Sequence, residues 1–173
     1  MINRLIPTHE GCCGTKVAAN PNQGVRGITT QRRSEKPMEQ TSEVTAETEG
    51  STVVVSRTVK QPVKVVWDVL MTDDGAEALL GPGAKLGSKG HTWHSHNGRE
   101  GVIRSFHPLE QIRFSYRSNA ARTPSVVAVN LKPASDNATT IEIEHSNLSS
   151  DIDRGWALDR WSAALERIES DCL

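Results

Sequence analysis

The order of hydrophobic patterns along the chain constrains its fold more than any other feature. Between residues 92 and 146 short segments alternate apolar and polar residues, as in IRFSYR, where Ile112, Phe114 and Tyr116 share one face of a predicted strand. The end of the chain instead has helical spacing. Its apolar stripe consists of Leu158, Trp161, Leu165, Ile168 and Cys172. Because an apolar sheet face must be covered, this order predicts an α+β fold in which a curved antiparallel sheet wraps around a long C-terminal helix.

The segments before and within this pattern complete the prediction. A β-branched run predicts a first strand over 52–60, and apolar residues spaced i, i+3, i+4 and i+7 after Pro62 predict a helix. A second short helix follows, with Asp73 or Asp74 as its cap and Gly81-Pro82-Gly83 as its end. SVVAVNLK and TTIEIEHS predict two further strands, and Ser150 or Asp151 would cap the last helix.

The N-terminal residues have a different composition from the rest. The first 66 residues contain no Trp, Tyr or Phe, and residues 1–50 are rich in polar residues without a sustained apolar period. Such a segment buries too little surface to offset its ordering entropy, so we expect a disordered tail over 1–50 and one domain over 51–173. Met38 is a candidate for the true start of translation. A targeting peptide and an interaction arm are the alternatives.

Charge and composition exclude several classes of protein. The formal net charge is −1, which gives no electrostatic basis for a nucleic-acid or membrane partner. No apolar run is long enough to cross a bilayer, and no secretory signal is evident. Three cysteines, including the vicinal Cys12 and Cys13, make a poor disulfide framework. We therefore expect a cytoplasmic protein, and the sequence contains no motif for a nucleotide or other cofactor.

Three of the six histidines lie in GHTWHSHNGREG, around the strongest hairpin motif of the chain. Asn97-Gly98 favours a two-residue type I′ turn, which would place His94 opposite Gly101 and His91 opposite Arg104. Side chains alternate along a strand, so His94 and His96 would lie on one face and His91 on the other. A single metal ion could not bind all three, and two histidines are too few for a closed site. We predict no metal centre.

The same register predicts the inner face of the hairpin. We take the face with His91, Trp93, Val102, Arg104 and Phe106 as the concave one, because it contains the large apolar side chains. His91 and Arg104 would then be neighbours on an apolar face, where the arginine needs a partner, a water-filled cavity or an anionic ligand group. Alternatively, both lie at the sheet margin, with the arginine extended to solvent. His145 shares the face of Ile141 and Ile143, either as a buried histidine or as a group that polarises a ligand.

The aromatic residues have two interpretations. They either line a cavity between the sheet and the last helix or simply fill the core, and Tyr116 is the one whose hydroxyl would need a partner. The candidate pocket residues are Trp67, His91, Trp93, Arg104, Phe106, Phe114, Tyr116, His145, Trp156 and Trp161. No residue stands out as a catalytic nucleophile.

Several blocks in order resemble a known superfamily. VSRTVKQPVKVVWDVLMTDD, LLGPG, GVIRSFHPLEQIRFSYR, TTIEIEHSNL and RWSAALERIE together resemble the SRPBCC superfamily, and more narrowly the domains grouped with the activator of heat-shock protein 90 ATPase. The resemblance covers residues 52–173 and implies the helix-grip fold. Relatives often have Gly-Trp in the final helix, whereas this chain has Arg160-Trp161. A pocket of different shape is therefore expected.

Three functions follow from this resemblance and the residues together. The first is non-catalytic binding of a small hydrophobic molecule between the sheet and the last helix. The second is a protein-interaction module, such as a chaperone accessory or stress-response partner, which the resemblance suggests. The third is a polyketide cyclase-like or hydrolase-like enzyme, for which only His91 and His145 are plausible bases. We expect the first, without a cofactor.

Overall fold

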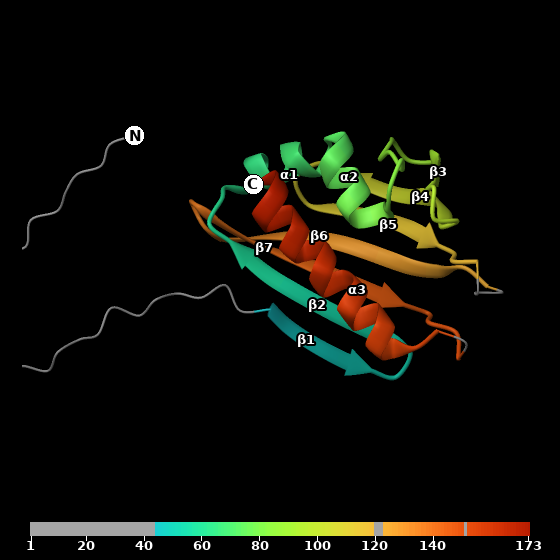
Figure 1. The fold of residues 1–173 in the computed structure, drawn as a ribbon. Coiled ribbons are helices and arrows are strands. Elements are labelled where there is room, and N and C mark those ends of the chain that lie inside the picture. The colour runs from blue at the N-terminus through green and yellow to red at the C-terminus, as the bar shows by residue number, and fades with distance from the viewer. Residues whose placement is uncertain (1–43, 120–122, 151) are drawn as a thin grey trace, which may run out of the picture. The chain divides into compact units, whose positions relative to one another are not determined.

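The computed structural model describes residues 44–119, 123–150 and 152–173. Seven strands form one antiparallel sheet in the order β1-β2-β7-β6-β5-β4-β3 (Figure 1). The strands are β1 (Val44–Glu49), β2 (Thr52–Val59), β3 (Thr92–His94), β4 (Glu100–His107), β5 (Gln111–Tyr116), β6 (Ser125–Ser135) and β7 (Ala138–Ser146). The helices are α1 (Val63–Leu70), α2 (Asp73–Leu80) and α3 (Arg154–Arg167), which continues as the π-helical turn η1 (Ile168–Cys172).

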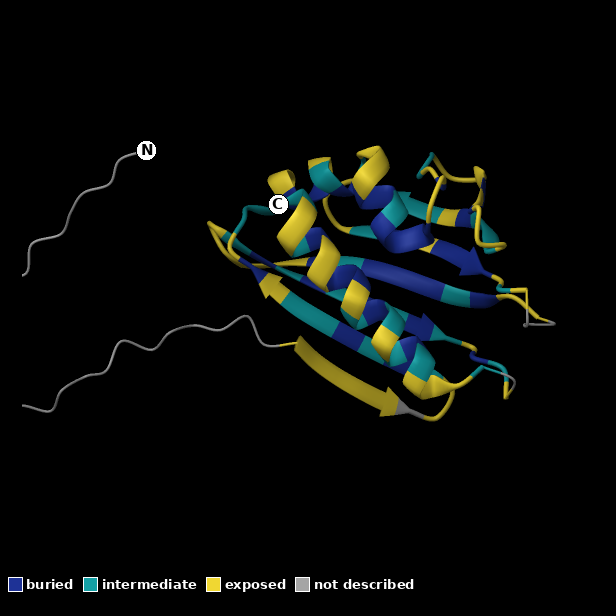
Figure 2. Ribbon diagram, in the orientation of Figure 1, coloured by how far each residue is buried: buried dark blue, intermediate teal, exposed yellow. Residues whose placement is uncertain are grey.

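The core lies between the inner face of the sheet and the helices. Along β7 every second residue is buried, from Thr139 through Ile141 and Ile143 to His145, and the residues between them are partly exposed (Figure 2). Helix α3 lies across this face and buries Ala157, Trp161, Ala164 and Leu165. The predicted α+β fold, a curved antiparallel sheet around a long C-terminal helix, is confirmed.

The helix caps differ from those predicted. Helix α2 begins after Thr72, whose hydroxyl accepts a hydrogen bond from the Gly75 N–H, so Asp73 and Asp74 lie in the first turn. Helix α3 begins after Asp153, whose side chain accepts from the Gly155 N–H, instead of at Ser150, and Asp151 lies outside the described residues. None of the helices in the described ranges is long and apolar enough to span a membrane.

Strand β1 lies within the segment that we expected to be disordered. Residues 44–49 pair with β2 in a regular antiparallel register, with Val44 opposite Arg57, so the prediction is wrong for them. Backbone pairing to an existing strand edge does not require apolar side chains. Residues 1–43, including Met38, lie outside the described part of the chain.

The β3–β4 hairpin has a register one residue away from the predicted one. His94 is opposite Glu100, and Trp93 is opposite Gly101. The Ser95 N–H donates to the Arg99 carbonyl and the Gly98 N–H to the Ser95 carbonyl, which leaves a three-residue loop instead of a two-residue type I′ turn. Only Gly98 of the Asn-Gly pair has a positive φ, +78°, as in a type I turn followed by a left-handed glycine.

A β-bulge interrupts the alternation of inward- and outward-facing side chains along β4. Ile103 pairs with Phe114, and Ser105 pairs with Arg113, which leaves Arg104 as the extra residue of a β-bulge. As a result Ile103 is buried, Phe106 is partly buried, and Arg104 between them is exposed. Of the two interpretations of Arg104, the inward one is therefore wrong, and its side chain is exposed to solvent as in the alternative. His91 is also exposed, just outside β3.

Candidate ligand-binding site

Five rings pack in one layer between the sheet and α3. Trp93 lies against Phe114 and Tyr116, with ring centroids 5.8 and 5.9 Å apart. Tyr116 in turn contacts His145 at 5.4 Å and Trp161 at 5.8 Å. All five side chains are at most 1% exposed. The rings thus fill the space between the sheet and α3. The alternative interpretation had placed a ligand cavity there.

A directed chain of hydrogen bonds crosses this aromatic layer. The Trp161 indole Nε1–H, which can only donate, lies 3.0 Å from His145 Nδ1. His145 Nδ1 must accept, so the neutral ring carries its proton on Nε2, which lies 2.6 Å from the Ser125 hydroxyl. Ser125 then donates to the Tyr116 carbonyl at 3.0 Å. The chain joins α3 to β7, β6 and β5, and it uses both nitrogens of His145.

Burial lowers the pKa of His145 to about 4 from an ordinary value of 6.5. The cause is that an imidazolium would lose its hydration inside the core. A second proton on Nδ1 would also face the Trp161 N–H instead of accepting from it. His145 is therefore a neutral residue at physiological pH, and its expected inward orientation is confirmed, with partners other than a backbone carbonyl.

Two buried donor groups of the aromatic layer have no hydrogen-bond acceptor among the described residues. They are the Tyr116 hydroxyl and Trp93 Nε1, both buried. Burial raises the pKa of Tyr116, while the positive charges of Arg99 and Arg160 oppose that rise. An unpaired buried donor costs roughly 1–3 kcal/mol, and neither residue is among those that line the cleft described below.

Arg160 is a charged residue that contacts this layer. From α3 its guanidinium donates to the Ala78 carbonyl at 3.2 and 3.3 Å and to the Leu79 carbonyl at 2.6 Å, at the C-terminal end of α2. The guanidinium also lies 5.0 Å from the centre of the Trp161 ring and interacts electrostatically with the Tyr116 hydroxyl. Its Nε is buried without an acceptor among the described residues.

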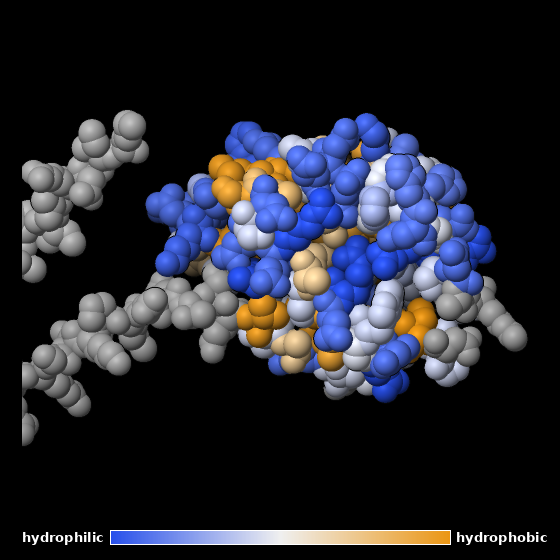
Figure 3. All heavy atoms as spheres, viewed as in Figure 1, coloured by the Kyte–Doolittle hydropathy of each residue, from blue (hydrophilic) through white to orange (hydrophobic). Residues whose placement is uncertain are grey.

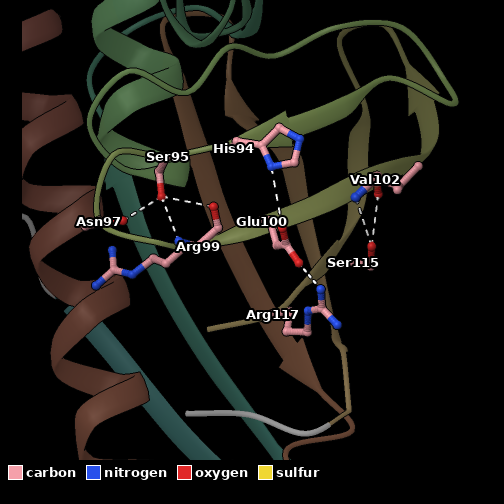
Figure 4. A network of polar contacts seen from close by, with 8 residues as sticks. All are labelled: His94, Ser95, Asn97, Arg99, Glu100, Val102, Ser115 and Arg117. Carbon is pink, nitrogen blue, oxygen red and sulfur yellow. Dashed lines mark hydrogen bonds and ion pairs between the residues drawn. The ribbon is translucent and has the colours of Figure 1, made fainter. Parts of the chain in front are cut away.

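A cleft opens beside Arg160, between α2, α3 and the β3–β4 turn. It has a volume of about 240 Å³, and we call it the arginine cleft. Its lining residues are Glu77, Ala78, Gly81, Pro82, Arg99, Arg160, Ala163, Ala164 and Arg167. Arg99 reaches it from the hairpin, with its side chain extended toward α3 (Figure 4). Strongly hydrophilic atoms gather near the centre of the face that Figure 3 shows, around α2 and α3.

A separate polar cluster occupies the outer side of the hairpin. Glu100 lies between Arg117 and His94, with 3.5 Å between His94 Nδ1 and Glu100 Oε2 (Figure 4). The hydrogen bond and charge of Arg117 lower the pKa of Glu100. Over the described ranges no group of three His, Cys, Asp or Glu residues could hold a metal ion.

The predicted pocket residues therefore separate into distinct groups. Trp93, Phe114, Tyr116, His145 and Trp161 meet in the aromatic layer. Trp67 and Phe106 form their own edge-to-face pair at 5.2 Å, and Trp156 is partly buried beneath the Arg99 guanidinium at 5.8 Å. His91 and Arg104 contribute to none of these groups because both are exposed.

Ser125, Arg99 and Arg160 were missed as site residues. Ser125 begins the inward-facing series that continues with Val127, Val129 and Leu131, so its burial could have been predicted from the alternation of β6. Arg160 precedes Trp161 at the position where the sequence departs from the resembled family. Nothing local indicated that Arg99 would reach α3, since that depends on the loop register.

Comparison with known proteins supports the fold. No protein-family model matches the sequence, and no curated protein has significant similarity to it. CalU16 from Micromonospora echinospora has a similar structure, with a TM-score of 0.59 and 19% identity over 73% of this chain and 83% of that one. MLL2253 from Mesorhizobium loti has a TM-score of 0.57 and 23% sequence identity, over 68% of this chain and 93% of that one. The Aha1 dimer from Colwellia psychrerythraea has a TM-score of 0.59 and 17% sequence identity, over 70% of this chain and 95% of that one.

These similarities define the class of protein at the level of fold. The chain has the helix-grip fold, shared with CalU16 and with the Aha1 structure. The expected resemblance is confirmed at that level.

Proposed function

We propose that this protein binds a small hydrophobic molecule without transforming it, at the arginine cleft and the edge of the aromatic layer next to it. The observation that carries the proposal is the Tyr116 O–H, a fully buried donor without an acceptor among the described residues. It lies next to Arg160, which itself lines the cleft. Tyr116 is not itself a lining residue, so a ligand carbonyl or hydroxyl would have to enter beside Arg160 to accept from it and recover part of its desolvation cost.

The interior chemistry favours binding over catalysis. Both ring nitrogens of His145 are engaged, by Trp161 and by Ser125, and His91 is exposed. A general base needs a free nitrogen within hydrogen-bond reach of a substrate. The cyclase-like and hydrolase-like alternatives therefore have little support from this geometry.

Native mass spectrometry of the gently purified full chain tests the proposal. We expect a non-covalent adduct of low mass, or binding of at least one member of a panel of small apolar molecules, and weaker binding by the Tyr116→Phe variant. The Trp67→Phe variant is a matched control because Trp67 is an aromatic residue outside the cleft. A bare mass after incubation with the whole panel would contradict ligand binding.

One observation favours a second function, a protein-interaction module. The rings of the aromatic layer already contact one another, so the interior does not need a ligand to be filled. The fold is also that of the Aha1 structure. This function predicts that the full chain changes the ATPase rate of a purified heat-shock protein 90, and an unchanged rate would argue against it.

A further inference from the structure

The arginine cleft contains more positive than negative charge. Arg99, Arg160 and Arg167 line it, and Glu77 is its only carboxylate among the described lining residues. One oxygen of Glu77 accepts a hydrogen bond from the Gly83 N–H at 2.9 Å, at the turn that follows α2. The lining thus has a net formal charge of about +2, because three guanidinium groups face one carboxylate.

Arg99 and Arg160 are not neutralised by the rest of the described chain. Neither Arg99 nor Arg160 has a carboxylate within ion-pair distance among the described residues, and Arg167 approaches Asp171 only at 4.0 Å. Arg160 donates to carbonyl groups, which satisfy hydrogen bonds but not charge. Arg99 contacts the Trp156 ring. A partly buried guanidinium usually has an anionic partner, so this pair lacks the expected counter-charge.

The walls of the cleft indicate what else a partner would contain. Ala78, Pro82, Ala163 and Ala164 present small apolar surfaces around the arginines. A volume of about 240 Å³ is below the roughly 300–1,000 Å³ of pockets for drug-sized ligands. A short apolar body with one anionic group matches both the walls and the charge.

We infer that the arginine cleft is a binding site for a small organic carboxylate, with its anionic group held between Arg99 and Arg160 and its apolar part against the alanine and proline walls. Guanidinium groups bind carboxylates through paired N–H donors, and the Arg99 guanidinium, which lines the cleft over the Trp156 ring, can present such a pair. The inference rests on the proposed function, because it names the chemical class of the ligand for the same site.

Benzoate and benzamide provide a matched pair of probes, since they have nearly the same shape and differ in charge. We expect isothermal titration calorimetry of the full chain at low ionic strength to show benzoate binding at least about tenfold tighter than benzamide, with the difference reduced by added salt. Arg99→Gln should remove most of that preference, and Arg99→Lys should retain part of it. Arg99 is the residue to change because its guanidinium makes no hydrogen bond within the described chain that the fold would lose.

Arg113→Gln is the control for net charge, because Arg113 is exposed on β5 and does not line the cleft. It should bind benzoate as the unmodified chain does. Equal binding of benzoate and benzamide, unaffected by Arg99→Gln, would overturn the carboxylate inference and leave apolar ligand binding standing. Binding of neither probe would also overturn it, and the proposed function would fail only if the apolar panel gave no adduct as well.

Discussion

At the scale of the residue, the titration of His145 makes the free energy of unfolding depend on pH. Its pKa is about 4 in the folded protein and 6.5 as the ordinary value, so the unfolded chain takes up the proton first as the pH falls. The contribution of neutral His145 to stability is therefore fully present above pH 6.5 and is lost between pH 6.5 and 4. Its size is roughly 3 kcal/mol, from the free energy of about 1.4 kcal/mol per pKa unit.

Chemical denaturation across this pH window tests the coupling. As the pH is lowered from 6.5 to 4, we expect the free energy of unfolding to decrease in the unmodified chain and to decrease much less in His145→Gln. The comparison concerns the slope with pH, so a lower overall stability of the variant does not affect it. Equal slopes for the two proteins would show that His145 is not buried and neutral.

Tyr116 and Ser125 make an informative pair at the same scale. Tyr116→Phe removes an O–H without an acceptor among the described residues, together with the interaction of its oxygen with Arg160, so it should change the free energy of unfolding little. Ser125→Ala removes both the acceptor of the His145 Nε2–H and the donor to the Tyr116 carbonyl, and should cost about 1–3 kcal/mol. Urea denaturation of the two variants measures both values. A large loss in Tyr116→Phe would mean that its O–H donates to an acceptor.

At the scale of the element, α2 depends on a residue from another helix. It has eight residues, too few to be stable alone, and its last carbonyl groups receive hydrogen bonds from Arg160 of α3. Packing of Leu79 and Leu80 into the core provides the rest of its stability.

Arg160→Gln should therefore loosen α2 selectively. Hydrogen exchange followed by mass spectrometry is expected to show faster exchange in peptides covering 73–81 and unchanged exchange in β6 and β7. Arg154→Gln, at an exposed position near the start of α3, is the control. Uniform acceleration across the sheet would instead indicate a global loss of stability.

Elements were predictable from periodicity, whereas their registers were not. The inward series of β5 and β7 and the stripe of α3 follow from alternation and helical spacing, and they place Tyr116, His145 and Trp161 together. The β3–β4 turn and the bulge at Arg104 depend on how the chain fits its neighbours, which local sequence does not record. That is why His91 and Arg104 were assigned to the wrong face and why Arg99 was missed.

At the scale of the whole molecule, β1 extends the sheet without contributing to the core. Its described side chains are exposed, so its stability comes from pairing with β2 (Figure 2). Removing it would leave β2 as the sheet edge, with backbone groups free to pair with another chain.

Two truncations separate these effects. A chain that starts at residue 51 should remain folded but show faster amide exchange in β2 and more self-association than a chain that starts at residue 44 and keeps β1. Size-exclusion chromatography and hydrogen exchange measure the two properties. Identical behaviour of the truncations would show that β1 does not pair stably in solution.

The hydrogen bond between the Trp161 indole and His145 also determines where α3 lies on the sheet. Apolar contacts have little directional preference, so a helix that carries a continuous apolar stripe could settle at neighbouring positions, displaced by a turn or rotated about its axis, with similar burial. A donor that must meet one nitrogen of one histidine does not tolerate such displacement. The hydrogen bond between Trp161 and His145 therefore selects a single position of α3 on the sheet. In doing so it fixes the spacing of the arginines across the cleft.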